Sequence, residues 1–210
     1  MAKLSIDQVD QFSNQTGSNK FFGIGEDKET KKVRFLLNDA NDLDIHFVHD
    51  VEVNGSTKKH VDCLRTSSSD PIDKCPFCAA KKWGGTKVFI PVYDLTDNEV
   101  RIWERGPKFI AKMQSLATRY NPLVSTIIEI ERNGKKGDTQ TTYEMYPLET
   151  DKSVTLETLP EKLNLDWLVL QKSAADMQYF LDMEAKTGIA AFPKEDKSKG
   201  VTPRLATTTQ

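Results

Sequence analysis

Cysteine placement constrains this chain more than any other feature of its sequence. Among 210 residues there are three cysteines, and two of them, Cys75 and Cys78, lie in a Cys-Pro-Phe-Cys sequence. Cys63 precedes this motif by twelve positions, and all three histidines of the chain precede Cys63. A structural Zn²⁺ site needs four sulfur or nitrogen donors in a tetrahedron, and a CxxC supplies two of them from one turn. The cysteines therefore predict one bound Zn²⁺ with a histidine as the fourth ligand.

The alternation of side chains along a strand indicates which histidine is the fourth ligand. The strand-like segment 45–53 carries Ile45, His49 and Val51 on one face. If apolar faces meet across the turn at Asn54 and Gly55, Val51 lies opposite Val61 and His49 lies opposite Cys63. Such partners have Cβ atoms about 4.5–5.5 Å apart, so they can share a metal ion. The expected ligands are His49, Cys63, Cys75 and Cys78, with His60 as the alternative to His49 if the turn is longer or carries a bulge.

Two other interpretations of the cysteines remain open. Cys63 can be an ordinary buried thiol, and His49 a hydrogen-bonded histidine of the core. The motif also resembles the CPxC of thiol-disulfide oxidoreductases, in which a helix N-terminus lowers the pKa of the first thiol. Here the residues before Cys75 are loop-like, and the segment after Cys78 reaches Gly84 too soon for a long helix.

Short segments rich in β-branched and aromatic residues alternate with turn residues along most of the chain. They predict strands at 31–37, 44–53, 60–65, 87–95, 99–105, 125–132 and 139–147, the first three as a meander. Helical spacing of apolar residues predicts a helix over 107–120 and another within 163–186. Hairpins with one helix between the later pairs are typical of the OB-fold, a five-stranded Greek-key barrel. The expected fold is mainly β with helical additions, an OB-fold barrel with an inserted zinc-binding loop and a C-terminal helix.

Changes in composition and periodicity predict the domain organisation. The polar N-terminal segment and the last residues lack the apolar pattern of a core. The expected parts are a flexible arm at 1–20, an OB-fold domain at 21–150 with its zinc subdomain at about 60–86, a helical extension at 151–188 and a disordered tail at 189–210.

The hairpin at 87–105 combines aromatic and basic residues. If the valines and isoleucines of its two strands pair, they form an aliphatic core face, and the aromatic and cationic side chains occupy the other face. Single-stranded nucleic acid offers flat bases and a charged backbone, and each base stacked on an aromatic ring contributes about 1–3 kcal/mol. Alternatively, Phe89 and Trp103 pack against a second layer formed by the zinc loop or the C-terminal helix. The expected DNA-binding residues are Phe89, Tyr93, Trp103 and Trp83 for stacking, and Arg101, Arg105, Lys108, Lys81, Lys82, Lys135 and Lys136 for phosphates.

The distribution of charge and the absence of common catalytic motifs limit the classes of function to be expected. Residues 58–136 carry 15 Lys and Arg against 9 Asp and Glu, although the net charge of the chain is −2, so an anionic ligand is expected in the middle. The sequence contains no Gly-rich phosphate loop, GxSxG or HExxH, and we expect no enzyme. No segment approaches the roughly 18–20 apolar residues of a membrane span, and the N-terminus lacks the apolar core of a signal peptide, so a cytoplasmic location is expected.

The order of these motifs resembles the zinc-containing single-stranded DNA-binding proteins of tailed bacteriophages, of the T-even helix-destabilising type. The resemblance covers roughly residues 20–148 and includes His49, Cys63, the CPFC motif, KVFIPVYDLTDNEVRIWERGPKF and IEIERNGKKGDTQTTYEMYP.

This resemblance implies several properties. It implies an OB-fold with a zinc subdomain and cooperative binding to single-stranded DNA without sequence preference. It also implies service in DNA replication, recombination and repair, contacts with replication and recombination proteins of the phage or host, and self-association along DNA in the host cytoplasm. A thiol-disulfide oxidoreductase and a zinc-ribbon module that binds RNA or protein remain the alternatives.

Overall fold

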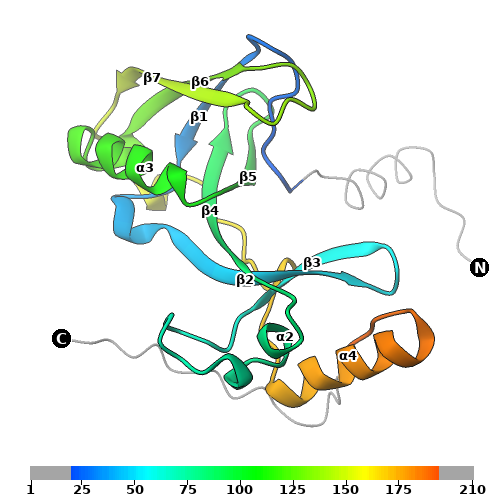
Figure 1. Ribbon diagram of the computed structural model, residues 1–210. Coiled ribbons are helices and arrows are strands. Elements are labelled where there is room, and N and C mark those ends of the chain that lie inside the picture. Colours follow the sequence, from blue (N-terminus) through cyan, green and yellow to red (C-terminus); the bar gives the residue numbers. More distant parts are fainter. Residues whose placement is uncertain (1–19, 194–210) are drawn as a thin grey trace, which may run out of the picture. The chain divides into compact units, whose positions relative to one another are not determined.

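The computed structural model describes residues 20–193, which divide into two units (Figure 1). Unit 1 contains residues 20–48 and 85–167, and unit 2 contains residues 49–84 and 168–193. Within these residues the fold is mainly β, with eight strands in an open mixed sheet and three α-helices. None of the described helices is long and apolar enough to cross a membrane.

The strands are β1 (Thr30–Phe35), β2 (Asp44–Val53), β3 (Thr57–Asp62), β4 (Gly85–Asp94), β5 (Glu99–Arg105), β6 (Thr126–Asn133), β7 (Thr142–Thr150) and β8 (Val169–Leu170). The helices are α2 (Pro76–Ala79), α3 (Lys108–Arg119) and α4 (Ala174–Thr187). Short 3-10 turns lie at Ala40–Asp42, Ile72–Lys74, Leu123–Ser125 and Leu156–Thr158.

Strand β1 is the central strand of unit 1. It pairs antiparallel with β4 on one side and with β6 on the other, while β4 also pairs with β5 and β6 with β7. The expected meander is therefore wrong, because β1 does not have β2 as its neighbour. Val33, Arg34 and Phe35 are buried in succession, so both faces of β1 are covered at its C-terminal end.

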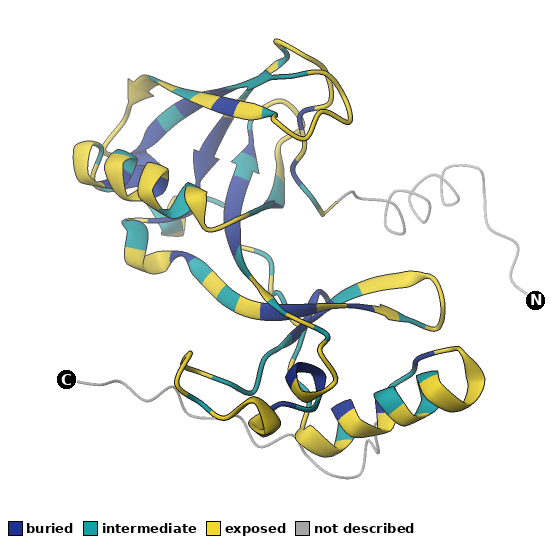
Figure 2. Cartoon of the chain, viewed as in Figure 1, coloured by how far each residue is buried: buried dark blue, intermediate teal, exposed yellow. Residues whose placement is uncertain are grey.

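Helix α3 covers part of the unit 1 core. Its apolar residues Met113 and Ala117 lie four positions apart and are buried, while most of its outer side is exposed (Figure 2). They pack with Val33, Phe35 and Trp103 of the sheet. The expected helix over 107–120 is confirmed, with bounds of Lys108–Arg119.

Unit 2 is built around the hairpin of β2 and β3. Asn54 and Gly55 have φ angles of 55° and 73°, the left-handed values that a tight hairpin turn requires. Strand β3 also pairs in parallel with β8, placing His60 beside Val169. The turn predicted from Asn-Gly is confirmed, although β8 lies in a segment that was expected to be helical.

Helix α4 begins eleven residues later than expected, at Ala174. Ser173 caps it by accepting a hydrogen bond from the amide of Asp176, and the Asp176 side chain accepts from the amide of Ser173 in return. Gly188, with φ of 72°, ends it. The prediction was wrong for 163–173 because composition alone does not register this cap or the pairing of β8.

Residues 189–193 belong to the folded part of the chain, which corrects the start of the predicted disordered tail. The carbonyl of Ala190 accepts a hydrogen bond of 2.9 Å from the amide of Asn54, and the side chain of Ala190 is buried. The remainder of the predicted tail, 194–210, and the predicted arm at 1–19 lie outside the described residues.

Candidate metal centre and nucleic-acid interface

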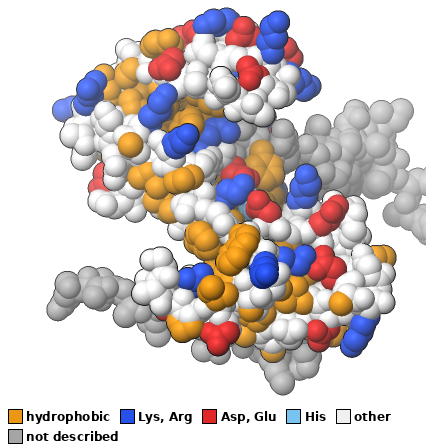
Figure 3. All heavy atoms as spheres, in the orientation of Figure 1, with side chains coloured by type: hydrophobic (Ala, Val, Ile, Leu, Met, Phe, Trp, Pro, Cys, Tyr) orange, Lys and Arg blue, Asp and Glu red, His pale blue; other side chains and the backbone are white. Residues whose placement is uncertain are grey.

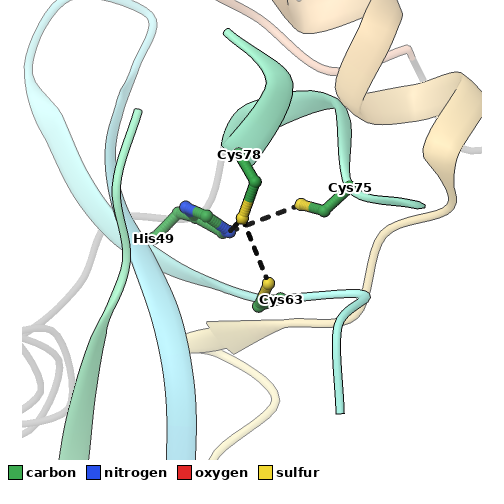
Figure 4. A group of neighbouring side chains, drawn as sticks. All are labelled: His49, Cys63, Cys75 and Cys78. Carbon is green, nitrogen blue, oxygen red and sulfur yellow. Dashed lines mark hydrogen bonds between the residues drawn. The ribbon is translucent and has the colours of Figure 1, made fainter. Parts of the chain in front are cut away.

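Four side chains of unit 2 point toward one another (Figure 4). His49 comes from β2, Cys63 follows β3, Cys75 directly precedes α2, and Cys78 lies within α2. Their donor atoms all lie within 4.8 Å of one another, so the group could hold a metal ion. These are the four residues that the sequence predicted as ligands.

His60, the alternative ligand, takes another role. Its Nδ1 lies 2.6 Å from a carboxylate oxygen of Asp50. Asp50 follows His49 directly in β2, and neighbouring side chains of a strand point to opposite faces. Strand alternation therefore places the two histidines in different environments, and of the two only His49 belongs to the cluster.

The CPFC segment forms a tight turn that brings its two thiols together. Pro76 occupies the first position of α2, where its missing N–H costs no hydrogen bond. The amide of Ala79 donates to the carbonyl of Cys75 at 3.0 Å, which closes the turn. Phe77 points into the unit 2 core, where its ring lies 5.4 Å from the ring of Phe180 on α4.

The distances within the cluster suit a tetrahedral ion. Ligand atoms at the usual Zn–S and Zn–N distances lie about 3.6–3.8 Å apart around a tetrahedral centre. Here Sγ of Cys63 and Sγ of Cys78 are 3.6 Å apart, and Nε2 of His49 lies 3.4 Å from Sγ of Cys75 and 3.8 Å from Sγ of Cys78. Three thiols and one imidazole are a donor set that structural zinc sites use.

Burial sets the protonation of the cluster before any ion binds. Burial lowers the pKa of His49, although the hydrogen bond to the Lys82 carbonyl opposes this, so the ring stays neutral and keeps a lone pair. Burial raises the pKa of Cys63 to about 12. Burial also opposes ionisation of Cys75, but hydrogen bonds from backbone amides, that of Cys78 foremost, outweigh it and hold its pKa below the usual value. Metal binding would therefore displace thiol protons.

Helix α4 covers the cluster, which the sequence did not predict. Sδ of Met177 lies 3.8 Å from Sγ of Cys75, and both residues are fully buried. Phe180 packs beside Phe77, whose ring lies 5.4 Å from the imidazole of His49. The available signal was the spacing of Met177 and Phe180 by three residues, which puts both on one face of a helix.

The same burial bears on the redox interpretation. Thiol-disulfide exchange needs a thiolate that a second protein can reach. Cys75 is 0% exposed, and the helix that follows it has only four residues. The geometry therefore favours metal binding over exchange.

Trp83 is the most exposed of the expected DNA-binding aromatic residues. Its side chain is 63% exposed, and it directly follows Lys81 and Lys82. On unit 1, Lys135 and Lys136 are exposed in the turn between β6 and β7. Of the other expected contacts, Lys108 is exposed and Tyr93 is partly buried.

Phe89 and Trp103 were expected on an open face, and this is wrong. Ile90 pairs with Trp103, and Pro91 pairs with Ile102, a register shifted by one residue from the expected one. Such a shift moves every side chain of a strand to the opposite face. Trp103 therefore joins Val88, Ile90 and Val92 in the unit 1 core at 0% exposure. Phe89 stays on the other face of β4 and is also 0% exposed, with its ring 5.7 Å from that of His46 on β2. Both rings are packed, as in the alternative, but Trp103 packs on Phe22, Phe109 and Tyr143 instead of the zinc loop or the C-terminal helix.

The two arginines of β5 are already engaged within unit 1. Arg101 lies within 3.0 Å of carboxylate oxygens of Asp94, Asp97 and Glu99. Arg105 places its guanidinium 4.4 Å from the ring centre of Trp103, and burial lowers its pKa. Neither is an open phosphate contact in this structure.

Phe47 is an exposed aromatic residue that was not among the expected DNA-binding residues. Phe47 and Ile45 are each 45% exposed on one face of β2 in unit 1. His49, two residues further on the same face, is buried. The strand passes from unit 1 to unit 2 between Val48 and His49, and alternation alone does not reveal that change.

Figure 3 shows Lys and Arg side chains interspersed with acidic and hydrophobic ones on the visible side of each unit. No family model, curated protein or solved structure matches this chain, so its function has to be inferred from this geometry.

Proposed function

We propose that this protein is a non-enzymatic, sequence-independent single-stranded DNA-binding protein that contains one structural Zn²⁺. The observation that carries the proposal is the 63% exposure of Trp83 directly after Lys81 and Lys82. Large aromatic side chains are mostly buried in folded proteins. An exposed aromatic ring beside lysines is suited to stack on a base while the lysines contact the neighbouring phosphates.

The strand pairing of unit 1 supports an OB-fold scaffold. The strands β1, β4, β5, β6 and β7 pair as β1–β4, β4–β5, β1–β6 and β6–β7, with α3 between β5 and β6 in the chain. An OB-fold is a partly open five-stranded barrel that binds oligonucleotides with its strand 2–3 face and with two loops, the one after its first strand and the one between its last two strands. In this scheme β4 and β5 are strands 2 and 3.

Both of those loops carry residues suited to nucleic acid. The connection between β1 and β4 contains Phe47 and Trp83, and the connection between β6 and β7 contains Lys135 and Lys136. Arg132 shapes this second loop by donating hydrogen bonds to the carbonyls of Gly134 and Lys135. The two lysine side chains stay exposed and can reach phosphates.

The biological setting is part of the proposal and derives from the motif resemblance. We place the protein in phage DNA replication, recombination and repair, in the cytoplasm of a host cell. Its partners would be replication and recombination proteins and further copies of itself along the strand. The cluster of His49, Cys63, Cys75 and Cys78 would hold the zinc ion.

Tryptophan fluorescence during titration with a single-stranded oligonucleotide, and with its duplex, tests the function. The single strand should quench the emission, high salt should weaken the effect, and the duplex should have little effect. The Trp83→Ala variant should lose about 1–3 kcal/mol of binding free energy, the contribution of one stacked base. Tyr179→Ala is the matched control, because Tyr179 is also exposed but has no lysine beside it. Equal binding of the single strand and the duplex, or no binding of either, would refute the proposed function.

Lys136→Ala should reduce the salt dependence of single-strand affinity. Each phosphate contact contributes about 0.7 to the slope of log affinity against log salt for single strands. We expect the slope to fall by about that amount for each lysine removed from the β6–β7 turn. Lys152→Ala, an exposed lysine outside both loops, should leave the slope unchanged. The role of the turn is excluded if both variants behave alike.

A further inference from the structure

The backbone just before Trp83 is fixed by the end of α2. The amide of Lys82 donates to the carbonyl of Phe77 at 2.9 Å, and the amide of Lys81 donates to the carbonyl of Cys78 at 3.0 Å. These are the two hydrogen bonds of a Schellman motif, which usually has glycine in the left-handed position. Lys81 occupies that position with φ of 60°, a strained conformation that its surroundings must hold.

His49 of the metal cluster makes a further hydrogen bond, to the backbone of Lys82. Nδ1 of His49 lies 2.6 Å from the carbonyl oxygen of Lys82, and a carbonyl can only accept, so Nδ1 carries the proton. Nε2 then bears the lone pair and faces Sγ of Cys75 and Sγ of Cys78. Metal-bound histidines commonly use their second nitrogen in this way. One imidazole thus joins the cluster to the residue that precedes Trp83.

The ring of Trp83 has little else to fix its position. Within the described residues it makes no aromatic or cation–π contact, and it is mostly exposed. The side chain of Lys82 forms an ion pair with Glu184 of α4 at 2.8 Å, but both side chains are partly exposed, and such pairs contribute little. The position of Trp83 therefore depends on the backbone on either side of it, that of Lys82 and that of Gly85, which pairs with Val48 at the start of β4.

We propose that the hydrogen bond from His49 to the Lys82 carbonyl makes the position of Trp83 depend on occupancy of the metal centre. Zn²⁺, when bound, would take the lone pair of Nε2 and so fix the ring and its Nδ1–H. The ring holds the Lys82 carbonyl, and this carbonyl belongs to the peptide unit that leads into Trp83. Resting on the proposed function, the inference assigns regulation of single-strand binding to the metal state of unit 2.

Nitrogen-15 relaxation of tryptophan-labelled protein tests the coupling without any DNA. The three tryptophans give three backbone amide signals, and Trp83→Phe identifies the one from Trp83. With zinc bound, the order parameter of this amide should be about 0.85, and after removal of zinc by a chelator it should fall below about 0.6. Trp103 and Trp167, which lie in unit 1, are internal controls and should not change. An unchanged Trp83 amide would overturn the proposal.

His49→Cys separates the hydrogen bond from the metal. The variant keeps four donors, a Cys₄ set that also holds structural zinc, but has no donor for the Lys82 carbonyl. In its zinc-bound form, a mobile Trp83 amide with ordered α4 amides supports the proposal, and an ordered Trp83 amide overturns it. If the variant does not bind zinc, the comparison of the wild-type protein with and without zinc decides. Loosening of Trp83 with α4 still ordered supports the coupling, whereas joint loosening of both shows that metal only maintains the fold.

Single-strand titrations then separate this inference from the proposed function. Removal of zinc should weaken single-strand binding of the wild-type protein to the level of Trp83→Ala, and should weaken Trp83→Ala itself much less. If the protein binds no single-stranded DNA, the proposed function fails while the relaxation result still decides the coupling. If it binds DNA with equal affinity with and without zinc, the regulatory part is wrong and the proposed function stands.

Discussion

Cys78→Ser is expected to abolish stoichiometric zinc binding and to lower the thermal stability of unit 2, while unit 1 keeps its stability. Sγ of Cys78 lies 3.6 Å from Sγ of Cys63, and a serine hydroxyl is a poor substitute for a thiolate on zinc. Structural zinc contributes about 10–16 kcal/mol in zinc-finger peptides, where binding and folding are one process. Unit 2 also has an apolar core of its own, in which Val61, Phe77 and Phe180 are buried, so it should stay folded without zinc at a lower stability.

Metal analysis and thermal unfolding test this expectation together. The wild-type protein should bind one zinc ion per chain, and the variant should bind none and unfold its unit 2 at a lower temperature. Ala79→Ser is the matched control, because it adds the same hydroxyl to an exposed position of α2 and removes no ligand. Retention of one zinc ion by Cys78→Ser would contradict the assignment of the site.

Trp103→Ala should lower the free energy of unfolding by about 3–5 kcal/mol, the usual cost of truncating a large buried aromatic residue. Its ring is 0% exposed and lies edge-on to the rings of Phe22, Phe109 and Tyr143, with centroids 5.1–5.7 Å away. The substitution also removes the aromatic face over which the guanidinium of Arg105 lies. Both effects destabilise unit 1.

Denaturant unfolding of two variants distinguishes packing from DNA contact. Trp83→Ala removes an exposed ring and should change the free energy of unfolding by no more than about 0.5 kcal/mol. Trp103→Phe keeps an aromatic ring in the core and should lose less stability than Trp103→Ala. A Trp103→Ala protein that is as stable as wild type but binds single strands weakly would return Trp103 to an open face.

The cluster of candidate metal ligands could be predicted from the sequence because the chemistry of such ligands is specific and their spacing is local. Few residue types bind zinc, the CPFC turn fixes two of them, and strand alternation separates His49 from His60. None of these arguments needs the tertiary fold. The covering helix could not be predicted in the same way, because Met177 meets Cys75 only after a chain separation of about a hundred residues.

The face of Trp103 was mispredicted because the strand register depends on one residue of a turn. Asp94 pairs with Glu99, so four residues form the loop, and Asn98 takes a left-handed φ of 55°. The expected pairing of the aliphatic residues would have needed a loop of different length. Sequence patterns define the two strands well, but loop length and turn type decide which face of each strand is buried.

Unit 2 is built from two separate stretches of the chain, and this has a consequence for its synthesis on the ribosome. All four donors have been made once Cys78 is added, whereas α4, which covers them, begins 96 residues later at Ala174. At about 5–20 residues per second, this interval lasts about 5–20 s. During that time the nascent chain presents three uncovered thiols, so capture of an ion, and not burial, is what can first protect them from oxidation.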